Sequence, residues 1–388
     1  MNTVPATASV VVIGAGPAGM TAGIALADAG VDVVLLDQLA EGANTSRAAV
    51  VHARTLEVLD EFGVAGELTE RGLIVDQFDL NDGARRLATV GFDGLPTRFP
   101  YALLISQATT EEVLLARLRK AGGTVLRPYT VSVVKGDETG VTIEFTDAAG
   151  DPGSIRADYV IGADGMHSVV REQAGIGFTG ASYPESFALA DVRMDWPDPR
   201  TEVSLHLAPQ GFMLVAPLPD EQDDRFRIVA TIDEAPEYPD LAFMQAIIDD
   251  RHPGGRVREV LWSSRFRVHH RLADHYRAGR ILLAGDAAHV HSPAGGQGMN
   301  TGIQDGALLG QLLARVLHGE PDILLDQYEA IRRPIAQGVV ALTDRMTRMA
   351  TLRPRPARAL RNAVIRIALS FPGMRRAMAF RLAELTAR

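Results

Sequence analysis

The chain has 388 residues and no cysteine, which excludes disulfide frameworks, thiolate nucleophiles, iron–sulfur clusters and thiolate zinc sites. Its formal net charge of −9 and the scatter of its basic residues argue against a nucleic-acid partner and favour a small-molecule ligand. A chain of this length is expected to form two connected domains, or one domain with a large insertion. The apolar stretch Ser9–Ala27 is interrupted by glycines and follows no basic residue, so we expect a cytoplasmic protein with no targeting segment and no membrane span.

Hydrophobic periodicity predicts the first elements of the chain. A strand at Ser9–Ile13, a helix at Ala18–Ala29 and a strand at Asp32–Leu36 form a βαβ unit. A further helix is expected around Ala53–Leu59. The N-terminal part of the chain is therefore expected to follow an α/β pattern.

The turn between the first strand and the first helix carries the pattern Gly14-x-Gly16-x-x-Gly19. In this context Gly14 permits a tight turn, Gly16 lets the backbone approach a pyrophosphate, and Gly19 lets the helix pack on the strand. The phosphates would lie at the helix N-terminus, where free N–H groups and the helix dipole favour an anion. Asp37, after the second strand, is expected to accept hydrogen bonds from ribose hydroxyls.

The next part of the chain changes from a helical to an extended pattern. The helical period is lost over roughly Leu73–Tyr101, and Thr109-x-x-Glu112 ahead of an apolar run predicts a capping box at the start of a helix. Strands are then expected at Thr124–Arg127, Val131–Val134, Val141–Phe145 and Ser154–Ile161.

A second glycine pattern, Gly175-x-Gly177-x-x-Gly180, follows an expected helix at Ser168–Ala174 instead of a strand. The sequence Tyr183-Pro soon afterwards blocks a helix. We therefore interpret this pattern as a helix-ending turn, which leaves one dinucleotide site and no separate nicotinamide domain.

The middle of the chain, about Tyr183–Arg277, predicts antiparallel strands interrupted by a helix near Leu241–Asp249. The strands are expected at Val203–Leu207, Gly211–Ala216 and Phe226–Ile232. A last strand at Arg280–Ala284 and a helix at about Thr301–Leu317 return to the α/β pattern. After Met349 the chain is rich in arginine, with apolar residues at helical spacing. This predicts a helical tail docked through its apolar face, with membrane-surface or partner binding as the alternative.

Three further glycine-containing motifs occur in order after the first turn. They are Asp164-Gly165, Gly285-Asp286 and Gly295-Gly296-Gln297-Gly298-Met299-Asn300. With the first turn, they resemble the para-hydroxybenzoate-hydroxylase-like, or group A, flavoprotein monooxygenases over roughly Val10–Pro334. The order of all four patterns is far more specific than any one of them.

The resemblance implies that the dinucleotide is FAD. It implies that the Asp-Gly motif supports both FAD and the reduced nicotinamide, that Asp286 binds ribityl hydroxyls, and that backbone N–H groups of the last motif face the flavin's pyrimidine edge. Arg47 resembles an arginine that lies against the cofactor, Gln107 a glutamine that touches the ribityl chain, and Val131 a residue that meets adenine through its backbone. The expected cofactor-binding residues are Gly14, Gly16, Gly19, Asp37, Arg47, Gln107, Val131, Asp164, Gly165, Gly285, Asp286, Gly296, Gly298, Met299 and Asn300.

The segment Ser46–Gly63 resembles the phenol and aromatic-polyketide hydroxylase branch in particular. Larger members of that branch carry a thioredoxin-like C-terminal domain, which we expect to be absent because the chain stops at Arg388, soon after the resemblance ends. We expect an α/β fold, in which a Rossmann-like FAD-binding domain carries an inserted antiparallel β-sheet substrate domain and a helical C-terminus. The FAD-binding domain is expected at residues 1–72, 102–182 and 278–350, the substrate domain at residues 73–101 and 183–277, and the arginine-rich helices at residues 351–388.

The resemblance implies hydroxylation of an activated aromatic substrate, phenolic or polyketide-like, with NADPH or NADH and molecular oxygen. In the family, non-covalently bound FAD is reduced and oxygen is transferred from a flavin C4a-hydroperoxide. The sequence identifies no acid–base residue. The residues considered for the substrate pocket are His206, Phe212, Met213, Pro293 and Gly295. No acidic residue completes a metal site with His289-x-His291 or His269-His270-x-x-x-x-His275, so we expect no metal.

Other functions are compatible with the same fold. A Baeyer–Villiger oxygenase, a flavin reductase or a dehydrogenase would share the cofactor, and a non-catalytic FAD-binding redox sensor would belong to another class. The lack of a Gly-x-Ser-x-Gly elbow argues against a serine hydrolase. A flavin halogenase usually carries Trp-x-Trp-x-x-Pro, whereas this chain has only Trp196 and Trp262. Both nicotinamides, and both a monomer and a homo-oligomer, are compatible with the sequence.

Overall fold

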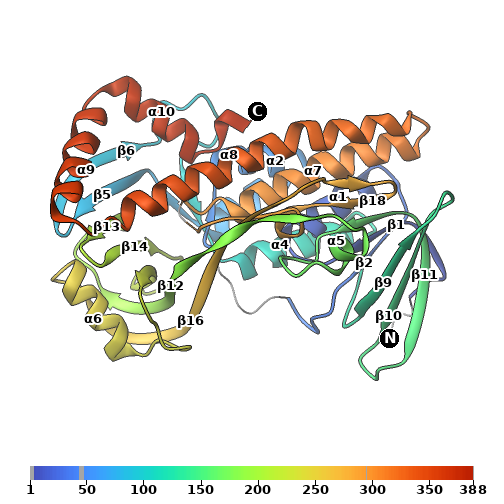
Figure 1. The fold of residues 1–388 in the computed structure, drawn as a ribbon, viewed down its shortest axis with the longest axis horizontal. Coiled ribbons are helices and arrows are strands. Elements are labelled where there is room, and N and C mark those ends of the chain that lie inside the picture. Colours follow the sequence, from blue (N-terminus) through green and yellow to red (C-terminus); the bar gives the residue numbers. More distant parts are fainter. Residues whose placement is uncertain (1–3, 43–47, 294, 388) are drawn as a thin grey trace.

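The computed structural model describes residues 4–42, 48–293 and 295–387. Two large β-sheets lie side by side in it, and long helices run along them (Figure 1). The helices are α1 (Pro17–Asp28), α2 (Ala53–Glu61), α3 (Ala65–Arg71), α4 (Gln107–Lys120), α5 (Val169–Gln173), α6 (Leu241–Arg251), α7 (Gly298–Leu317), α8 (Asp326–Ala350), α9 (Arg355–Ala368) and α10 (Pro372–Leu382), with 3-10 turns at Gly285–Ala287, Asp322–Leu325 and Leu385–Ala387.

The first sheet contains the parallel strands that the βαβ pattern predicts. Its strands are β1 (Thr7–Ile13), β2 (Val33–Leu36), β8 (Thr124–Leu126), β9 (Thr130–Gly136), β10 (Val141–Thr146), β11 (Pro152–Gly162), β17 (Arg277–Ala278) and β18 (Ile281–Leu283). The order is β17-β18-β11-β1-β2-β8, and β10 and β9 continue from β11. Val10, Val11 and Val12 of β1 are fully buried, because a central parallel strand is covered on both faces. The predicted α/β pattern is confirmed.

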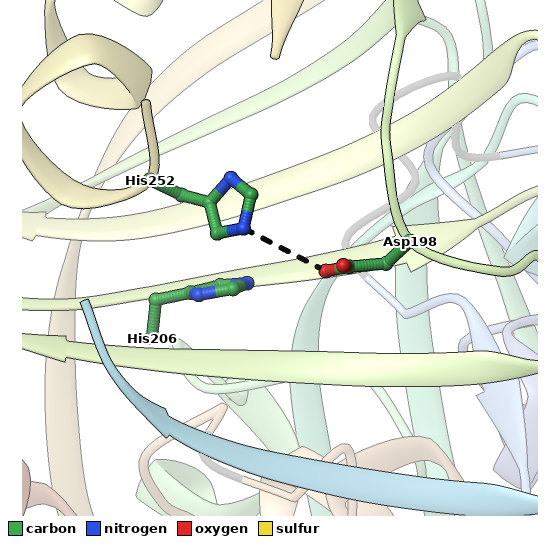
Figure 2. Close-up of side chains that lie close together, drawn as sticks. All are labelled: Asp198, His206 and His252. Atoms are coloured by element: carbon green, nitrogen blue, oxygen red, sulfur yellow. Dashed lines mark ion pairs between the residues drawn. The ribbon is translucent and has the colours of Figure 1, made fainter. Parts of the chain in front are cut away.

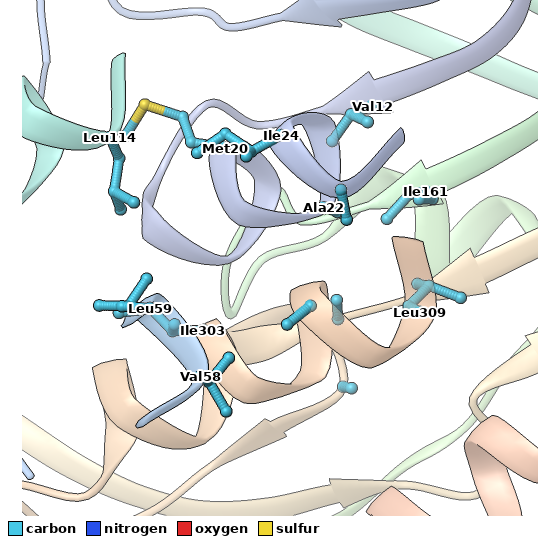
Figure 3. Packing of buried hydrophobic residues seen from close by; sticks show 14 of the residues in the cluster. Val12, Met20, Ala22, Ile24, Val58, Leu59, Leu114, Ile161, Ile303 and Leu309 are labelled. Atoms are coloured by element: carbon cyan, nitrogen blue, oxygen red, sulfur yellow. The ribbon is translucent and has the colours of Figure 1, made fainter. Parts of the chain in front are cut away.

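Helices α1 and α7 touch through their backbones. A Cβ atom on Gly306 would lie 2.2 Å from the carbonyl oxygen of Ala18, and one on Gly310 would lie 2.7 Å from the Cβ atom of Ala25. Any larger side chain at Gly306 would therefore push the two helices apart. Buried apolar residues of both helices fill the space around this contact (Figure 3).

The second sheet is mainly antiparallel, as predicted. Its strands are β5 (Gln77–Asp82), β6 (Arg85–Gly91), β12 (Phe178–Asp195), β13 (Glu202–Ala208), β14 (Gly211–Pro217), β15 (Arg225–Ile232), β16 (Arg256–Ala273) and β19 (His289–Val290). The order is β19-β16-β12-β15-β14-β13-β5-β6. Strand β13 pairs with β5 in parallel, which the sequence did not predict. A small third sheet joins β3 (Val50–Val51), β7 (Ala102–Leu104) and β4 (Leu73–Val75).

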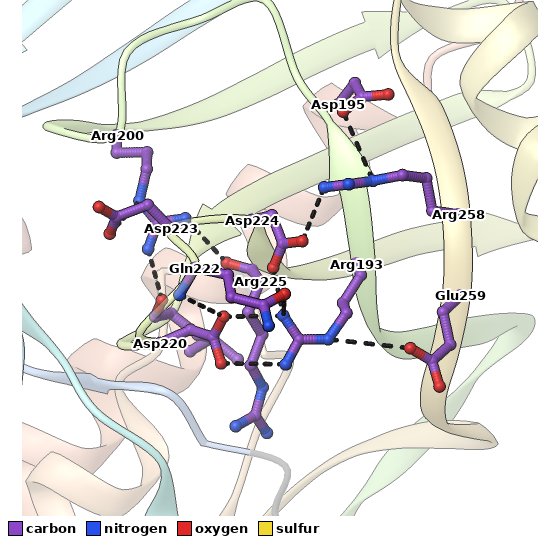
Figure 4. A network of polar contacts seen from close by, with 11 residues as sticks. Arg193, Asp195, Arg200, Asp220, Gln222, Asp223, Asp224, Arg225, Arg258 and Glu259 are labelled. Carbon is purple, nitrogen blue, oxygen red and sulfur yellow. Dashed lines mark hydrogen bonds and ion pairs between the residues drawn. The ribbon is translucent and has the colours of Figure 1, made fainter.

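Strands β12 and β16 are the elements that sequence periodicity missed. Each runs for 18 residues, and they pair from Phe178 opposite Ala273 to Asp195 opposite Arg256. Register shifts interrupt the pairing at three places, so side chains do not keep one alternation along the strand. An ion-pair network joins Arg193 of β12 and Arg258 of β16 to Asp220 and Asp224, which lie in the turn between β14 and β15 (Figure 4).

The start of α4 differs from the prediction by one helical turn. Ser106, not Thr109, is the N-cap, and its hydroxyl accepts a hydrogen bond from the backbone N–H of Thr109 at 3.1 Å. Thr109 therefore occupies the third helical position, where its own hydroxyl lies 2.8 Å from that of Ser106. Both residues suit a cap, and the tertiary path of the chain decides between them.

The C-terminal segment is helical, as predicted, but α9 does not bury its whole apolar face. Helices α9 and α10 contact β6, and Leu369 after α9 is buried. By contrast, Leu360, Val364 and Ile367 are 67%, 55% and 63% exposed. The expectation of docking through the apolar face is therefore only partly correct, because these three side chains point to solvent. Within the described ranges, no helix combines the length and apolar character needed to cross a membrane.

Candidate functional site

The glycine turn between β1 and α1 is shaped by two of its three glycines and left open by the third. Gly14 has a φ of +101°, and a Cβ atom there would lie 2.2 Å from the carbonyl oxygen of Ala163. A Cβ atom on Gly19 would lie 2.0 Å from the carbonyl oxygen of Gly14. A Cβ atom on Gly16 would meet nothing within 4 Å. The N-terminus of α1 thus faces open space, which suits an anionic group.

Asp37 supports this turn from the end of β2. Its carboxylate accepts hydrogen bonds from the backbone N–H groups of Ala15 at 2.7 Å and Leu39 at 2.8 Å. Arg127, which follows the neighbouring strand β8, donates to the carbonyl oxygen of Ala15 at 3.0 Å and lies 3.9 Å from the Asp37 carboxylate. The Nε atom of Arg127 is buried and has no hydrogen-bond partner among the described residues. A buried unpaired donor fits a site whose ligand supplies an acceptor.

The sequence did not predict that Arg127 contacts the glycine turn, because this contact depends on the order of the strands in the sheet. Strands β2 and β8 are parallel neighbours, so their carboxyl ends meet at the same edge of the sheet. The position of Arg127 as the last residue of a predicted strand was a usable signal. The order of the strands was not available from the sequence.

A cavity of about 520 Å³ connects the glycine turn with the second sheet. The glycine-containing motifs line one side of it, and side chains of β13, β14 and β15 line the other. The predicted site residues that line it are Gly16, Gln107, Gly165, Phe212, Gly285, Asp286, Pro293, Gly295, Gly296, Gly298 and Met299. Four motifs far apart in the sequence therefore meet at one cavity.

Other predicted cofactor residues lie behind this lining. Asp164 caps the start of α5, where it accepts from the hydroxyl of Ser168 at 2.5 Å and from the backbone N–H of Val170 at 3.2 Å. Burial raises the pKa of Asp164 above its ordinary value. Val131 is buried in β9, away from the cavity lining. Arg47 lies outside the described residues.

Two of the residues considered for the substrate pocket, His206 and Met213, face away from it. Val203 and Leu205 of β13 line the cavity, as do Phe212 and Leu214 of β14. Because side chains alternate along a strand, the intervening residues point to the opposite face. His206 and Met213 are paired across the two strands on that opposite face, so the expectation that they line the pocket was wrong.

The loop before α7 is held by a polar network around His52. The Nε2–H of His52 donates to the carbonyl oxygen of Gly295 at 2.8 Å, and its backbone N–H donates to the side-chain oxygen of Asn300 at 2.8 Å. The amide of Asn300 donates to the carbonyl oxygen of Gly296 at 2.8 Å. Burial lowers the pKa of His52 to about 4, so this histidine is neutral. Asn300 thus fixes the loop from behind and does not line the cavity.

Both the backbone conformation of Gly296 and the packing around it require glycine. Its φ is +64°, in the left-handed region that favours glycine. A Cβ atom there would lie 2.2 Å from the Cγ1 atom of Val50. The same loop is linked to the C-terminal helices, because the amide of Gln297 donates to the carbonyl oxygen of Leu382 at 3.3 Å.

The Gly-Asp motif rests on a buried charged network. Nε2 of His289 lies 2.6 Å from the Asp305 carboxylate, and Nε of Arg332 donates to the other Asp305 oxygen at 2.6 Å. The backbone N–H of Gly285 also reaches Asp305, at 3.3 Å. Burial alone would raise the pKa of Asp305, but the charges of Arg332 and His289 outweigh it and lower that pKa. The network fixes the motif, and His289 is engaged in it.

His291 is a polar side chain on the cavity wall. Its Nδ1–H donates to the carbonyl oxygen of Ser292 at 3.0 Å, and its Nε2 has no partner among the described residues. Burial lowers the pKa of His291 to about 4. The ring is therefore neutral, with Nε2 as an available hydrogen-bond acceptor. In the sequence it was considered only as a metal ligand.

The wall formed by the second sheet is mainly apolar. Leu214, Val229 and Phe266 line it. Arg227 also lines the cavity, but its guanidinium binds both oxygens of the buried Asp191 at 2.7 and 3.0 Å and donates to the carbonyl oxygen of Ala48 at 2.9 Å. This arginine ties the second sheet to the segment before β3. The wall therefore suits a flat apolar ligand.

Comparison with known proteins gives consistent results. The FAD binding domain family model matches residues 7–343. The 12-dehydrotetracycline 5-monooxygenase/anhydrotetracycline 6-monooxygenase of Streptomyces rimosus is 38% identical over 353 residues, which cover 86% of this chain and 68% of that enzyme.

Two solved structures are similar over most of the chain. The p-nitrophenol 4-monooxygenase of Pseudomonas putida has a TM-score of 0.89 at 27% identity, covering 99% of this chain and 100% of that one. A ternary complex of aklavinone-11 hydroxylase with FAD and aklavinone has a TM-score of 0.78 at 28% identity, covering 92% of this chain and 71% of that one.

Proposed function

The chain belongs to the FAD binding domain family, among its flavin-dependent aromatic monooxygenases, and from this premise we propose that it hydroxylates a phenolic ring held against the second sheet. The bound FAD supplies the redox and oxygen chemistry, and NAD(P)H is the reductant typical of the family. The residues of this chain bind and orient the cofactor and the substrate.

The observation that carries the proposal is the continuity of the cavity. One end opens on Gly16 and the N-terminus of α1, which we assign to the pyrophosphate. Asp37 and Arg127 would hold the adenosine side. Asp286 and the Gly295–Gly298 loop would hold the flavin side. The ring to be hydroxylated would lie beyond that loop, against the apolar side chains of β14 and β15.

The substrate class follows from the wall and from the relatives. A flat apolar wall with few free polar groups favours an aromatic ring over a charged or sugar-like ligand. By their names, the relatives given above act on p-nitrophenol and on 12-dehydrotetracycline and anhydrotetracycline. We therefore propose a phenolic or aromatic-polyketide substrate.

His291 is our candidate for contact with the substrate hydroxyl. His291 lines the cavity, and Nε2 of its neutral ring is buried without a partner among the described residues, so a ligand packed against this ring would supply the missing donor. A hydrogen bond from a phenolic hydroxyl to this nitrogen would polarise the O–H bond and make the ring more electron-rich, which assists the transfer of an electrophilic oxygen.

The reaction type can be tested with isotopically labelled oxygen. Purified FAD-loaded protein is incubated with NADPH or NADH, 18-oxygen gas and a panel of phenols and polycyclic aromatics. We expect NAD(P)H oxidation that depends on the aromatic compound, and a product carrying one labelled oxygen on the ring. Labelled oxygen beside a carbonyl would indicate a Baeyer–Villiger reaction, and fast NAD(P)H oxidation without labelled product would indicate a reductase.

The role of His291 can be tested separately. His291→Phe keeps a ring but removes the acceptor, and we expect kcat to fall by about 100-fold, the scale of acid–base assistance, with FAD binding retained. His318→Phe, at an exposed position after α7, is the matched control. An unchanged kcat and pH profile in His291→Phe would remove this residue from the proposal without affecting the reaction type.

A further inference from the structure

Three potential metal-ligating side chains meet on the face of the second sheet that points away from the cavity. Asp198 lies in the loop between β12 and β13, His206 on β13, and His252 at the end of α6 (Figure 2). One ligand atom from each lies within 4.8 Å of the others, and within the described ranges no other such group of three was found. Nε2 of His252 lies 4.0 Å from the Asp198 carboxylate.

The ring of His206 has the orientation expected of a metal ligand. The Nδ1–H of His206 donates to the carbonyl oxygen of Gly83 at 3.0 Å, so Nε2 is the acceptor and receives a hydrogen bond from the Ser204 hydroxyl at 3.0 Å, which a metal ion would displace. In metal sites, the ligating histidine usually donates its other ring N–H to a carbonyl in this way.

The surroundings of His252 also favour a bound cation. His252 is the C-cap of α6, where the partial negative charge of the helix end stabilises a positive group. Its ring packs on Trp196 with 4.6 Å between ring centres, which restricts its orientation. The Asp198 side chain is 23% exposed, so an ion can enter from solvent at that side.

Contacts within the protein do not satisfy all the polar atoms of this cluster. The 4.0 Å separation of His252 and Asp198 is too long for a hydrogen bond. The Nδ1 atom of the buried His252 has no partner among the described residues. Two imidazoles and a carboxylate placed together without mutual hydrogen bonds are the set that binds a borderline transition metal.

We propose that Asp198, His206 and His252 bind a divalent first-row transition metal, of which zinc is the representative. Metal–ligand bonds of about 2.0–2.2 Å place neighbouring ligand atoms roughly 3.3 Å apart, so the cluster must contract by about 1 Å. Asp198 lies in a loop and can supply this movement. The ion would join the 196–201 loop, β13 and the end of α6, with its remaining position open to water. The sequence-based expectation of no metal considered other histidines and did not bring these three together.

The test uses the full chain without an affinity tag, loaded with FAD and dialysed against a chelator that is then removed. Zinc is added in isothermal titration calorimetry and in thermal unfolding. We expect one zinc ion per chain and a higher Tm with zinc. In Asp198→Asn and His252→Gln, the zinc affinity should fall at least tenfold and the Tm increase should be lost. His318→Ala, which removes an exposed histidine, should bind zinc as the unchanged protein does.

The flavin provides an internal check on folding. Asp198→Asn is nearly isosteric, and its FAD absorbance should match that of the unchanged protein. Absence of zinc binding by the unchanged protein overturns the proposal. Equal zinc affinity in the unchanged protein and in both variants also overturns it, because the ion would then bind elsewhere. Neither result bears on the hydroxylase reaction, since the cluster does not line the cavity.

Discussion

Gly16→Val separates cofactor binding from folding more cleanly than any other substitution in the glycine turn. Gly16 has an extended backbone with a φ of −80°, which any residue adopts, and its missing Cβ has no neighbour within 4 Å. Valine therefore fits the cofactor-free protein without strain. With cofactor bound, the added side chain occupies the space that we assign to the pyrophosphate.

The expected magnitude follows from the contacts that would be lost. Displacement of the phosphate removes at least one hydrogen bond between a backbone N–H and a charged oxygen, which contributes about 1.5–3 kcal/mol. This corresponds to a roughly 10- to 150-fold increase in the Kd for FAD. Cofactor-free protein is titrated with FAD by fluorescence, and its Tm is measured separately.

Gly66→Val is the matched control, because Gly66 is exposed on α3 and a Cβ there also meets nothing within 4 Å. We expect the cofactor-free Tm of Gly16→Val to stay close to that of the unchanged protein, and the Kd for FAD to change only in Gly16→Val. A Kd for FAD that is the same in all three proteins would show that the pyrophosphate does not approach Gly16.

Three further predictions test other parts of the site. Asp37→Ala removes the acceptor for the backbone N–H of Ala15 in the turn and for that of Leu39, so both the cofactor-free Tm and the affinity for FAD should fall. An unchanged Tm would contradict the supporting role. The Cβ atom of Gly296→Ala should collide with Val50 and increase the peroxide released per NAD(P)H oxidised. Adding Val50→Ala should lower that peroxide yield again, and identical peroxide yields in the single and double variants would argue against this contact. Burial raises the pKa of Glu384 from 4.5 to about 8. Between these two pH values the folded protein keeps a proton on Glu384 that the unfolded protein loses, so the free energy of unfolding falls as the pH rises from 4.5 to about 8. At about 1.4 kcal/mol per pKa unit, Glu384→Gln should gain several kcal/mol over the unchanged protein between pH 5 and pH 8 in urea unfolding; parallel pH profiles would contradict the raised pKa.

The sequence predicted the parts of the site that depend on local backbone geometry. Gly14 and Gly19 are needed for the tight turn and for the packing of α1 on β1, which both belong to one βαβ unit, so the sequence pattern predicts the turn. Arg127 and His52 reach the site through sheet order and through contacts with distant loops, and no local pattern places them together with the glycine motifs. Strand alternation places Phe212 and Met213 on opposite faces of β14, so the expectation that both line the pocket could not hold, but which of the two faces borders the cavity is decided by how the sheets pack.

The histidine cluster illustrates the same limit. Asp198, His206 and His252 come from a loop, a strand and a helix end, and their spacing in the sequence matches no metal-binding motif. Their proximity depends on the packing of α6 on the sheet. Ser106 and Thr109 show the limit at short range, since both suit a helix cap and only the path of β7 into α4 selects the first.

The backbone contact between α1 and α7 has a consequence for changes in substrate range. Helix α1 begins at the turn that we assign to the phosphates, and α7 begins at the loop that we assign to the flavin ring. With Gly306 pressed against the carbonyl oxygen of Ala18, the two helices have little freedom to slide or separate. The two ends of the cofactor are then held at a fixed spacing by one rigid support, and a larger or smaller substrate must be accommodated by the opposite wall. Directed evolution toward new aromatic compounds should therefore accumulate its changes in β13, β14 and β15 and spare the helix pair.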